Sequence, residues 1–225
     1  MKKSSIAEYA LRLLLLFAGL LIAHLGVTLF ILSDLGADPF NVLIQGLHKL
    51  IGSAGAAQVT HGMTHMAISF LIILVLLLVD RSYIKAGTLV CMFCGGPIID
   101  FFTWLLGGLH IPTSPLPVKA AAMVAGCLIL AFGMTIVIRS EAGTGPNDLV
   151  AVVISDKSGK RFGIVRILVD FCFVAIGALL GGRFGVGTLV CAFLVGPTAE
   201  LCMPVSRALV ERALGLLSKR NGESA

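Results

Sequence analysis

The stretch LSDLGADPFNVLI at residues 32–44 follows a long apolar run, yet it contains two Asp, a Gly, a Pro and an Asn. A related stretch, RSEAGTGPNDLVA, occurs at residues 139–151. Proline at the first position of a helix costs no hydrogen bond, and Asp38 just before Pro39 is a good helix cap. Each stretch therefore predicts that a new helix begins at its proline, directly after a long apolar segment.

The composition excludes a soluble protein. Of the 225 residues, 57% are hydrophobic and 13% are charged, and the mean hydropathy is +1.01. Soluble domains have about 45–50% apolar and about 25% charged residues. Long apolar runs indicate helices rather than a β-barrel. We expect an all-α membrane protein that is not an enzyme, with no cofactor and no nucleic-acid partner.

Six apolar runs are long enough to cross a bilayer. The predicted spans are residues 11–32, 63–79, 86–106, 118–138, 163–181 and 185–205. With the N-terminus inside, 13 of the 17 Lys and Arg residues fall on the cytoplasmic side, three fall outside and Arg166 lies within a span. This distribution follows the positive-inside rule and predicts that both termini are cytoplasmic. The tail, residues 206–225, is expected to be an amphipathic cytoplasmic segment.

Two further apolar segments, residues 39–51 and 146–156, are too short to cross. At 1.5 Å per residue, a helix of this length covers roughly 15–20 Å of a core about 30 Å thick. We interpret them as re-entrant half-helices.

The sequence also repeats itself. The two quoted stretches match at an offset of 107 residues, and GTLVCMFCGGPIID at 87–100 matches GTLVCAFLVGPTAE at 187–200. Each half, residues 1–110 and 111–205, contains three spans, so the second half enters the membrane from the opposite side. A 3+3 inverted-topology repeat is common among secondary transporters. The alternative is that duplication only produced a compact bundle.

Polar residues within the apolar segments are the candidate functional groups, because burying them in a membrane is costly. Arg166 and Asp170 are four residues apart and share a helix face, where they bind a ligand or form a structural ion pair. The matching positions in the first half hold His65 and Ser69. The lone His24 is expected to be a hydrogen-bonded structural residue, with a proton-relay role as the alternative.

Asp100 and Glu200 each follow a Gly-Pro pair that predicts a broken or kinked helix, although capping or snorkelling roles remain as alternatives. The candidate substrate- or ion-binding residues are Asp38, Asn41, Asp100, Asn147, Asp148, Arg166, Asp170 and Glu200. The residues expected to shape the backbone are Gly36, Pro39, Gly96, Pro97, Gly143, Pro146, Gly196 and Pro197. Cys91 and Cys94 form a C-x-x-C pair, but Leu194 replaces the second cysteine in the repeat, so we expect packing and no metal site.

The segments GADPFNVL at 36–43, GTGPNDL at 143–149 and RILVD at 166–170 resemble the YczE/YyaS/YitT family of bacterial membrane proteins. The resemblance extends from about residue 10 to 205. YitT-type members often carry a soluble C-terminal domain for which this chain is too short, so we expect the YczE/YyaS-like branch. The resemblance implies a location in the bacterial inner membrane but no particular substrate.

These features together predict a secondary transporter of a small solute that works by alternating access. Helix N-termini and Arg166 favour an anionic solute, and the acidic residues would bind a coupling proton or cation. The partners expected are the lipid bilayer and the solute, and assembly with further copies of the chain is left open. The alternatives are a passive channel, since aquaporins also use two inverted half-helices, or a non-transporting membrane scaffold or regulator.

Overall fold

The structure, a computed structural model, describes residues 3–53, 59 and 61–222, and this part of the chain contains helices and no strand. Its α-helices are α1 (Lys3–Leu32), α2 (Pro39–Ser53), α3 (His61–Asp80), α4 (Ala86–Leu106), α5 (Leu116–Arg139), α6 (Pro146–Ser158), α7 (Phe162–Leu179) and α8 (Val186–Gly222). Three short 3-10 helices connect them: η1 (Arg81–Tyr83), η2 (Gly107–Leu109) and η3 (Ile111–Thr113).

Six of these helices are long and apolar enough to cross a membrane, as predicted: α1, α3, α4, α5, α7 and α8. Large apolar side chains such as Leu78, Trp104 and Leu179 are exposed on their outer surface, where they contact lipid. The two short helices begin at Pro39 and Pro146, as the sequence indicates. The fold is therefore an all-α membrane bundle with two short internal helices.

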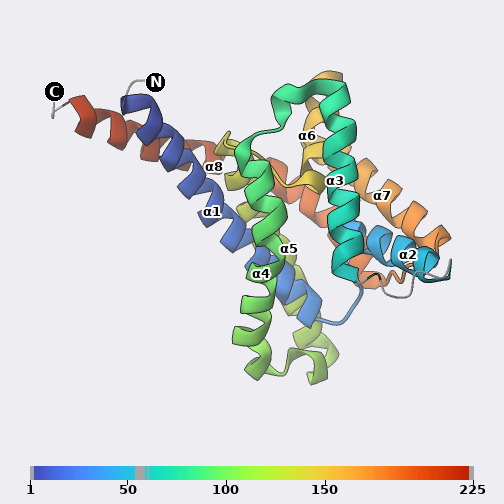
Figure 1. The fold of residues 1–225 in the computed structure, drawn as a ribbon. Coiled ribbons are helices and arrows are strands. Elements are labelled where there is room, and N and C mark those ends of the chain that lie inside the picture. Colours follow the sequence, from blue (N-terminus) through green and yellow to red (C-terminus); the bar gives the residue numbers. More distant parts are fainter. Residues whose placement is uncertain (1–2, 54–58, 60, 223–225) are drawn as a thin grey trace.

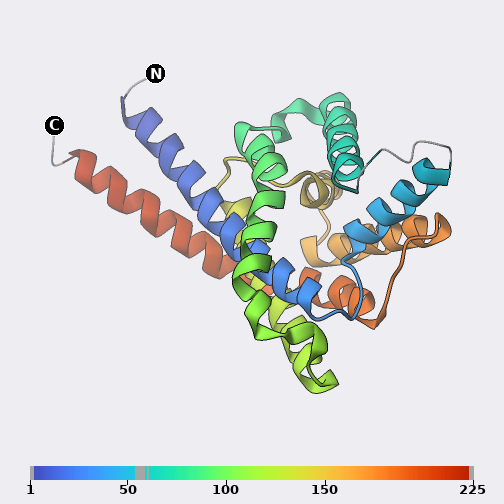
Figure 2. The same ribbon diagram turned by 60° about the horizontal axis from the view of Figure 1, so that its bottom comes forward.

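The helices form two groups of four (Figures 1 and 2). One group contains α1, α4, α5 and α8, and the other contains α2, α3, α6 and α7. Each group takes two helices from each half of the sequence. The groups meet mainly where α7 packs against α8, and the two chain termini lie at the same end of the bundle (Figure 1).

The closest helix pair is α1 with α5, and it crosses at glycines. A Cβ atom added to Gly26 would lie 2.5 Å from the carbonyl oxygen of Gly126, and one added to Gly133 would lie 2.7 Å from that of Gly19. Small residues let helix backbones touch in a bilayer, where apolar burial alone does not favour association. The same two glycine positions of each half thus contact the other half.

The connections after α1 and α5 have the same backbone geometry. Asp34 and Glu141 have φ angles of 53° and 58°, and Gly36 and Gly143 have φ angles of 143° and 148°. Asp34 and Glu141 thus adopt the left-handed region, which few residues with a side chain occupy, and the φ angles near 145° explain the glycines at positions 36 and 143.

Each of these connections also binds the other half of the chain. The N–H of Gly187 donates to the Leu35 carbonyl at 2.9 Å, and the N–H of Gly87 donates to the Ala142 carbonyl at 2.9 Å. Ion pairs also link each connection to the other half: Arg12 lies 2.9 Å from Glu141, and Lys119 lies 3.7 Å from Asp34. These contacts fix where α2 and α6 begin.

Of the two alternatives predicted at Pro97 and Pro197, a broken helix is wrong, because α4 and α8 continue through both prolines, and a kink stays a prediction. Breaking a helix within a membrane would leave further backbone groups without partners, which costs more than the one hydrogen bond that proline removes. The C-terminal tail is likewise continuous with α8 up to Gly222 rather than a separate helix.

We expect Gly133→Ala to destabilise the protein by about 1–3 kcal/mol, because the added methyl group overpacks the α1–α5 crossing. The measurement is the free energy of unfolding in detergent micelles. Gly96→Ala is the matched control, since no atom lies within 4 Å of a Cβ added there. Equal stability of the two variants would contradict the role of the crossing.

Candidate functional site

The N-terminus of α2 is capped by Asp38. Its Oδ1 accepts the backbone N–H of Asn41 at 3.2 Å, and its Oδ2 accepts the Asn41 side-chain amide at 2.5 Å. Both residues are half-buried. Asp38 therefore satisfies one of the free N–H groups at the start of the helix, as its position before Pro39 predicts.

The N-terminus of α6 is arranged differently. Gly145 occupies the position before Pro146 and has no side chain to cap the helix. Asn147 donates from Nδ2 to Oδ1 of Asp148 at 3.0 Å, so that the polar groups of the first turn contact each other. The carboxylate of Asp148 then points toward α7 and is free to bind a cation there.

That cation is Arg166. Its Nη1 lies 2.5 Å from Oδ1 of Asp148, and its Nε lies 3.0 Å from Oδ2 of Asp170 on the same helix. The Arg166 side chain is 7% exposed and that of Asp170 is fully buried. Oδ1 of Asp170 has no hydrogen-bond partner among the described residues. A single guanidinium thus serves the buried carboxylate of Asp170 and the half-buried carboxylate of Asp148, and one buried oxygen of Asp170 is left without a partner among the described residues.

The structure brings further groups to this cluster, which we define as Asp148, Arg166 and Asp170. Asp38 lies within electrostatic range of Asp170, so the N-termini of α2 and α6 converge on it. His24 of α1 lies within range of both Asp38 and Asp148.

His24 is a residue near this cluster that the sequence pattern did not indicate. Its Nδ1 bonds to the Leu20 carbonyl at 2.8 Å, and its Nε2 would lie 2.9 Å from a Cβ at Gly95 of α4. Gly95 leaves the space that the imidazole fills. In the sequence, His24 is an ionisable residue inside a predicted span. That position alone does not indicate that it lies near Asp38 and Asp148.

The matching positions of the first half hold less polar groups. His65 packs edge-on against Phe40 of α2, with ring centroids 5.3 Å apart, and Ser69 is buried. His65 on α3 therefore contacts the start of α2, much as Arg166 on α7 contacts the start of α6. The charged cluster belongs to the second half alone.

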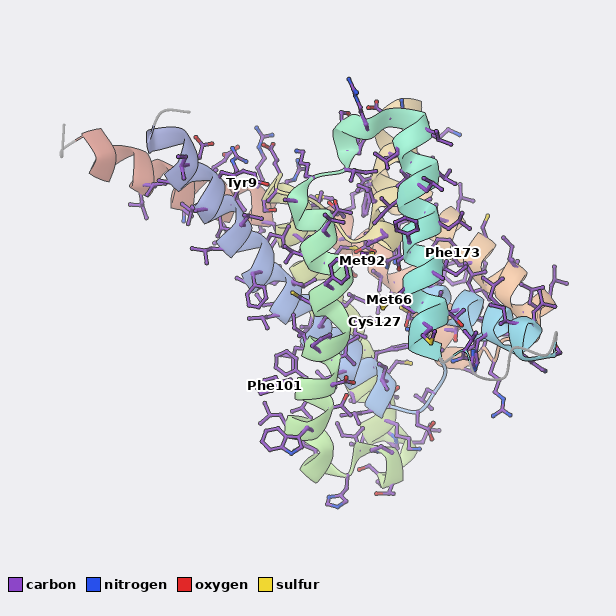
Figure 3. The ribbon with its side chains drawn as sticks, viewed as in Figure 1. Tyr9, Met66, Met92, Phe101, Cys127 and Phe173 are labelled. Carbon is purple, nitrogen blue, oxygen red and sulfur yellow. The ribbon has the colours of Figure 1, made fainter. Side chains whose placement is uncertain are left out.

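Asp100 and Glu200 occupy matching positions in α4 and α8 but have different surroundings. Asp100 is exposed beside Phe101, which is labelled in Figure 3, and the structure does not bring it to the cluster. Glu200 is half-buried and binds Nε of Arg161 at 2.5 Å. Neither carboxylate contacts Arg166, so the eight candidate residues do not form one site.

The residues chosen for backbone geometry also separate into two classes. Pro39 and Pro146 are buried at the helix starts, whereas Gly96, Pro97 and Pro197 lie on exposed faces of their helices. Gly196 is buried because it packs against the carbonyl oxygen of Gly163, which would lie 2.6 Å from an added Cβ. Among the described residues, no three His, Cys, Asp or Glu side chains are grouped to hold a metal ion.

A cavity of about 650 Å³ opens on the side of α6. It is lined by the ends of η1 and α5, one face of α6, the start of α7 and part of α8. Gly143 and Thr144, which lead into α6, belong to its wall. The cavity thus gives access to the connection that positions Asp148.

Comparison with known proteins identifies relatives along nearly the whole chain. Residues 10–204 match a family of unknown function, DUF6198. The chain is 29% identical over 208 residues to the uncharacterised membrane protein YczE of Bacillus subtilis, covering 92% of each chain.

It is 28% identical over 187 residues to YyaS of Bacillus subtilis, covering 83% of this chain and 90% of that protein. It is also 28% identical over 202 residues to an uncharacterised protein of Haemophilus influenzae, covering 88% of this chain and 86% of that one. No solved structure matches.

Two variants of Asp38 separate helix capping from other roles. Asp38→Ala is expected to lower the free energy of unfolding by about 0.5–2 kcal/mol, because it removes the cap. Asp38→Asn keeps an oxygen acceptor and is expected to remain close to the unchanged protein. The measurement is thermal or chemical unfolding in detergent, and equal loss in both variants would mean that the charge rather than the cap matters.

Arg166→Gln is expected to destabilise the protein by about 3–5 kcal/mol, because it leaves the buried carboxylate of Asp170 and the half-buried carboxylate of Asp148 without a cation. Adding Asp148→Asn and Asp170→Asn to that variant should restore part of the loss. Arg207→Gln is the control, because Arg207 pairs with Glu211 at an exposed site and its loss should change little. Full stability of Arg166→Gln would argue against a charged cluster.

Proposed function

The chain belongs to the DUF6198 family, a family of unknown function, and within it to the YczE/YyaS-like membrane proteins. From the geometry of the chain itself, we propose that it is a secondary transporter. It moves a small solute across the bacterial inner membrane by alternating access, with both termini in the cytoplasm. The excess of Lys and Arg on the side of the termini supports this orientation. We place it among transporters rather than enzymes.

The observation that carries this proposal is the buried cluster of Asp148, Arg166 and Asp170. Ionised groups inside a membrane bundle are expensive, and they occur where ions, protons or substrates bind. The cluster lies where α6 packs against α7, and α7 in turn packs against α8 at the junction of the two helix groups. A binding site between two groups that move relative to each other is the arrangement that alternating access requires.

The charges of the cluster favour a coupling cation or proton over an anion. Arg166 supplies one positive charge, whereas Asp148 and Asp170 supply two negative charges and Asp38 adds a third within electrostatic range. The uncoordinated Oδ1 of Asp170 offers a place for a proton or a small cation among the described groups. Arg166 is occupied by carboxylates and does not present a free guanidinium to an anionic solute.

The exchanged contacts between the halves support an inverted repeat as the basis of the transport cycle. Glycines at matching positions contact the opposite half, and each connection before a short helix accepts a hydrogen bond from the opposite half. In such repeats, the two sides of the membrane alternate in access because the halves exchange their conformations.

The two sides differ in how tightly they are packed. On the α2 side, Gly46 meets the carbonyl oxygen of Gly177 on α7, which would lie 2.3 Å from an added Cβ. On the α6 side, the larger side chains Leu76 and Val153 occupy the matching positions and pack through Leu149. The 650 Å³ cavity opens on this α6 side. We infer that the structure represents a conformation open to the cytoplasm and closed to the outside.

A reconstituted transport assay tests the proposal. Purified protein in liposomes is supplied with labelled phosphate or succinate under an imposed gradient of protons or sodium, and uptake and counterflow are measured. A pH difference of one unit provides about 1.4 kcal/mol per proton, enough for about tenfold accumulation of solute. A passive channel would show uptake without counterflow or gradient dependence, and a scaffold would show neither but would retain a stoichiometric protein partner.

Asp170→Asn is expected to abolish accumulation driven by the gradient while counterflow continues, because the neutral amide no longer binds the coupling ion. Asp100→Asn is the matched control, because it removes an exposed carboxylate of a spanning helix outside the cluster. Gradient-driven accumulation by Asp170→Asn at the level of the unchanged protein would remove the cluster from the coupling step.

A further inference from the structure

The cavity on the α6 side has an unusual charge arrangement. Five charged side chains line it: Lys85, Arg139, Glu141, Asp156 and Glu200. Two of the three carboxylates are already neutralised from outside the cavity, Glu141 by Arg12 at 2.9 Å and Glu200 by Arg161 at 2.5 Å. Asp156, which lies beside Tyr83, is the remaining anion. Arg12 also pairs with Glu8 at 3.1 Å, so the lining and its ion-pair network contain four cations and four anions, and Lys85 and Arg139 are the two cations of the lining itself.

Arg139 is the cation without a partner. It is the last residue of α5, and its guanidinium makes no hydrogen bond or ion pair among the described residues. Its Nε is completely buried. A buried donor without an acceptor is costly, so such groups require a specific explanation.

The repeat shows that packing does not require this arginine. The matching position in the first half is Leu32, a buried apolar residue at the end of α1. The other conserved features of the connection, the φ angles and the exchanged hydrogen bonds, are present in both halves. Arg139 thus differs from its counterpart at a position that lines the cavity.

Lys85 provides a second cation at the same wall. It precedes α4, and its Nζ donates to the carbonyl oxygen of Glu141 at 2.7 Å, close to the end of α5. An ammonium group has three donors, so this bond leaves donors available. Thr144 and Ser155 add hydroxyl groups to the lining.

We propose that this cavity binds the solute through a carboxylate or phosphate group held by Arg139, with Lys85 as the second cation. The forked donors of a guanidinium match the oxygens of both kinds of anion. As a substrate site the inference rests on the proposed transport function, and it assigns separate places to the two ligands: the solute to Arg139 and the coupling ion to the cluster of Asp148, Arg166 and Asp170. The same chemistry also fits the phosphate of a lipid headgroup, which the test distinguishes.

Binding is measured on the purified full chain in nanodiscs of phosphatidylcholine. Inorganic phosphate and succinate are titrated calorimetrically, with choline chloride as the cationic control at equal ionic strength. We expect saturable binding of at least one anion and none of choline. Arg139→Gln should weaken the anion about tenfold or more, Lys85→Gln should weaken it less, and Arg207→Gln should bind like the unchanged protein. Absence of binding of both anions, or equal affinity in Arg139→Gln, would overturn the proposal.

A second arm identifies the source of the anionic group. Nanodiscs containing phosphatidylglycerol are compared by native mass spectrometry and by the same titrations. Soluble anions that bind equally in both lipids identify a solute site. Phosphatidylglycerol retained by the unchanged protein but lost in Arg139→Gln, together with weakened anion binding, identifies the headgroup as the occupant and overturns the solute assignment.

The outcomes separate this inference from the transport proposal. Anion binding that depends on Arg139, with no gradient-driven uptake in liposomes, would support the anion site and contradict the proposed transport function. Gradient-driven uptake whose KM is unchanged in Arg139→Gln would support the transport function and contradict the solute site at Arg139.

Discussion

In a bilayer, the lipid tails are as apolar as leucine, so two helices associate only where their backbones fit closely or their polar groups bind each other. The crossing of α1 and α5 meets this condition through Gly19, Gly26, Gly126 and Gly133. Because each half contributes the same pair of positions, the crossing fixes how the halves face each other. The crossing brings the connections that follow α1 and α5 to the opposite half, where the exchanged hydrogen bonds and ion pairs fix where α2 and α6 begin.

The charged groups obey a second constraint, which is that a buried charge needs a partner. Arg166 has two carboxylates, and Arg139 has none among the described residues. The molecule thus contains one place with an excess of negative charge and another with an unmatched positive charge. This separation is the physical basis for assigning a cation or proton to the first and an anionic solute to the second.

Much of the fold could be predicted from local patterns, because span length, helix-starting prolines and the i, i+4 spacing of Arg166 and Asp170 are properties of short segments. The environment of each side chain could not. Asp100 and Glu200 share a motif, yet one is exposed and the other binds Arg161, because that depends on which helices are neighbours. A break at Pro97 and Pro197, one of the two alternatives expected there, was wrong for a related reason: the local effect of proline does not include the cost of leaving backbone groups unpaired in lipid.

Arg139 and His24 were missed as site residues for the same reason. Arg139 counted only as a cation at the end of a span, and its lack of a partner emerges from the packing of α5, α6 and α8. His24 has no polar counterpart in the repeat, so the similarity of the two halves does not indicate it as a site residue. Its proximity to Asp38 and Asp148 arises from the crossing of helices far apart in sequence.

The exchanged hydrogen bonds have a consequence for assembly. Leu35 in the first half accepts its bond from Gly187 in the second, and Ala142 in the second accepts from Gly87 in the first. Neither half supplies all the hydrogen-bond partners of its own connection, so each connection is complete only when the other half is present. Fusing two such segments in one polypeptide fixes their ratio at one to one. It also frees the two copies to diverge, as leucine and arginine have at positions 32 and 139.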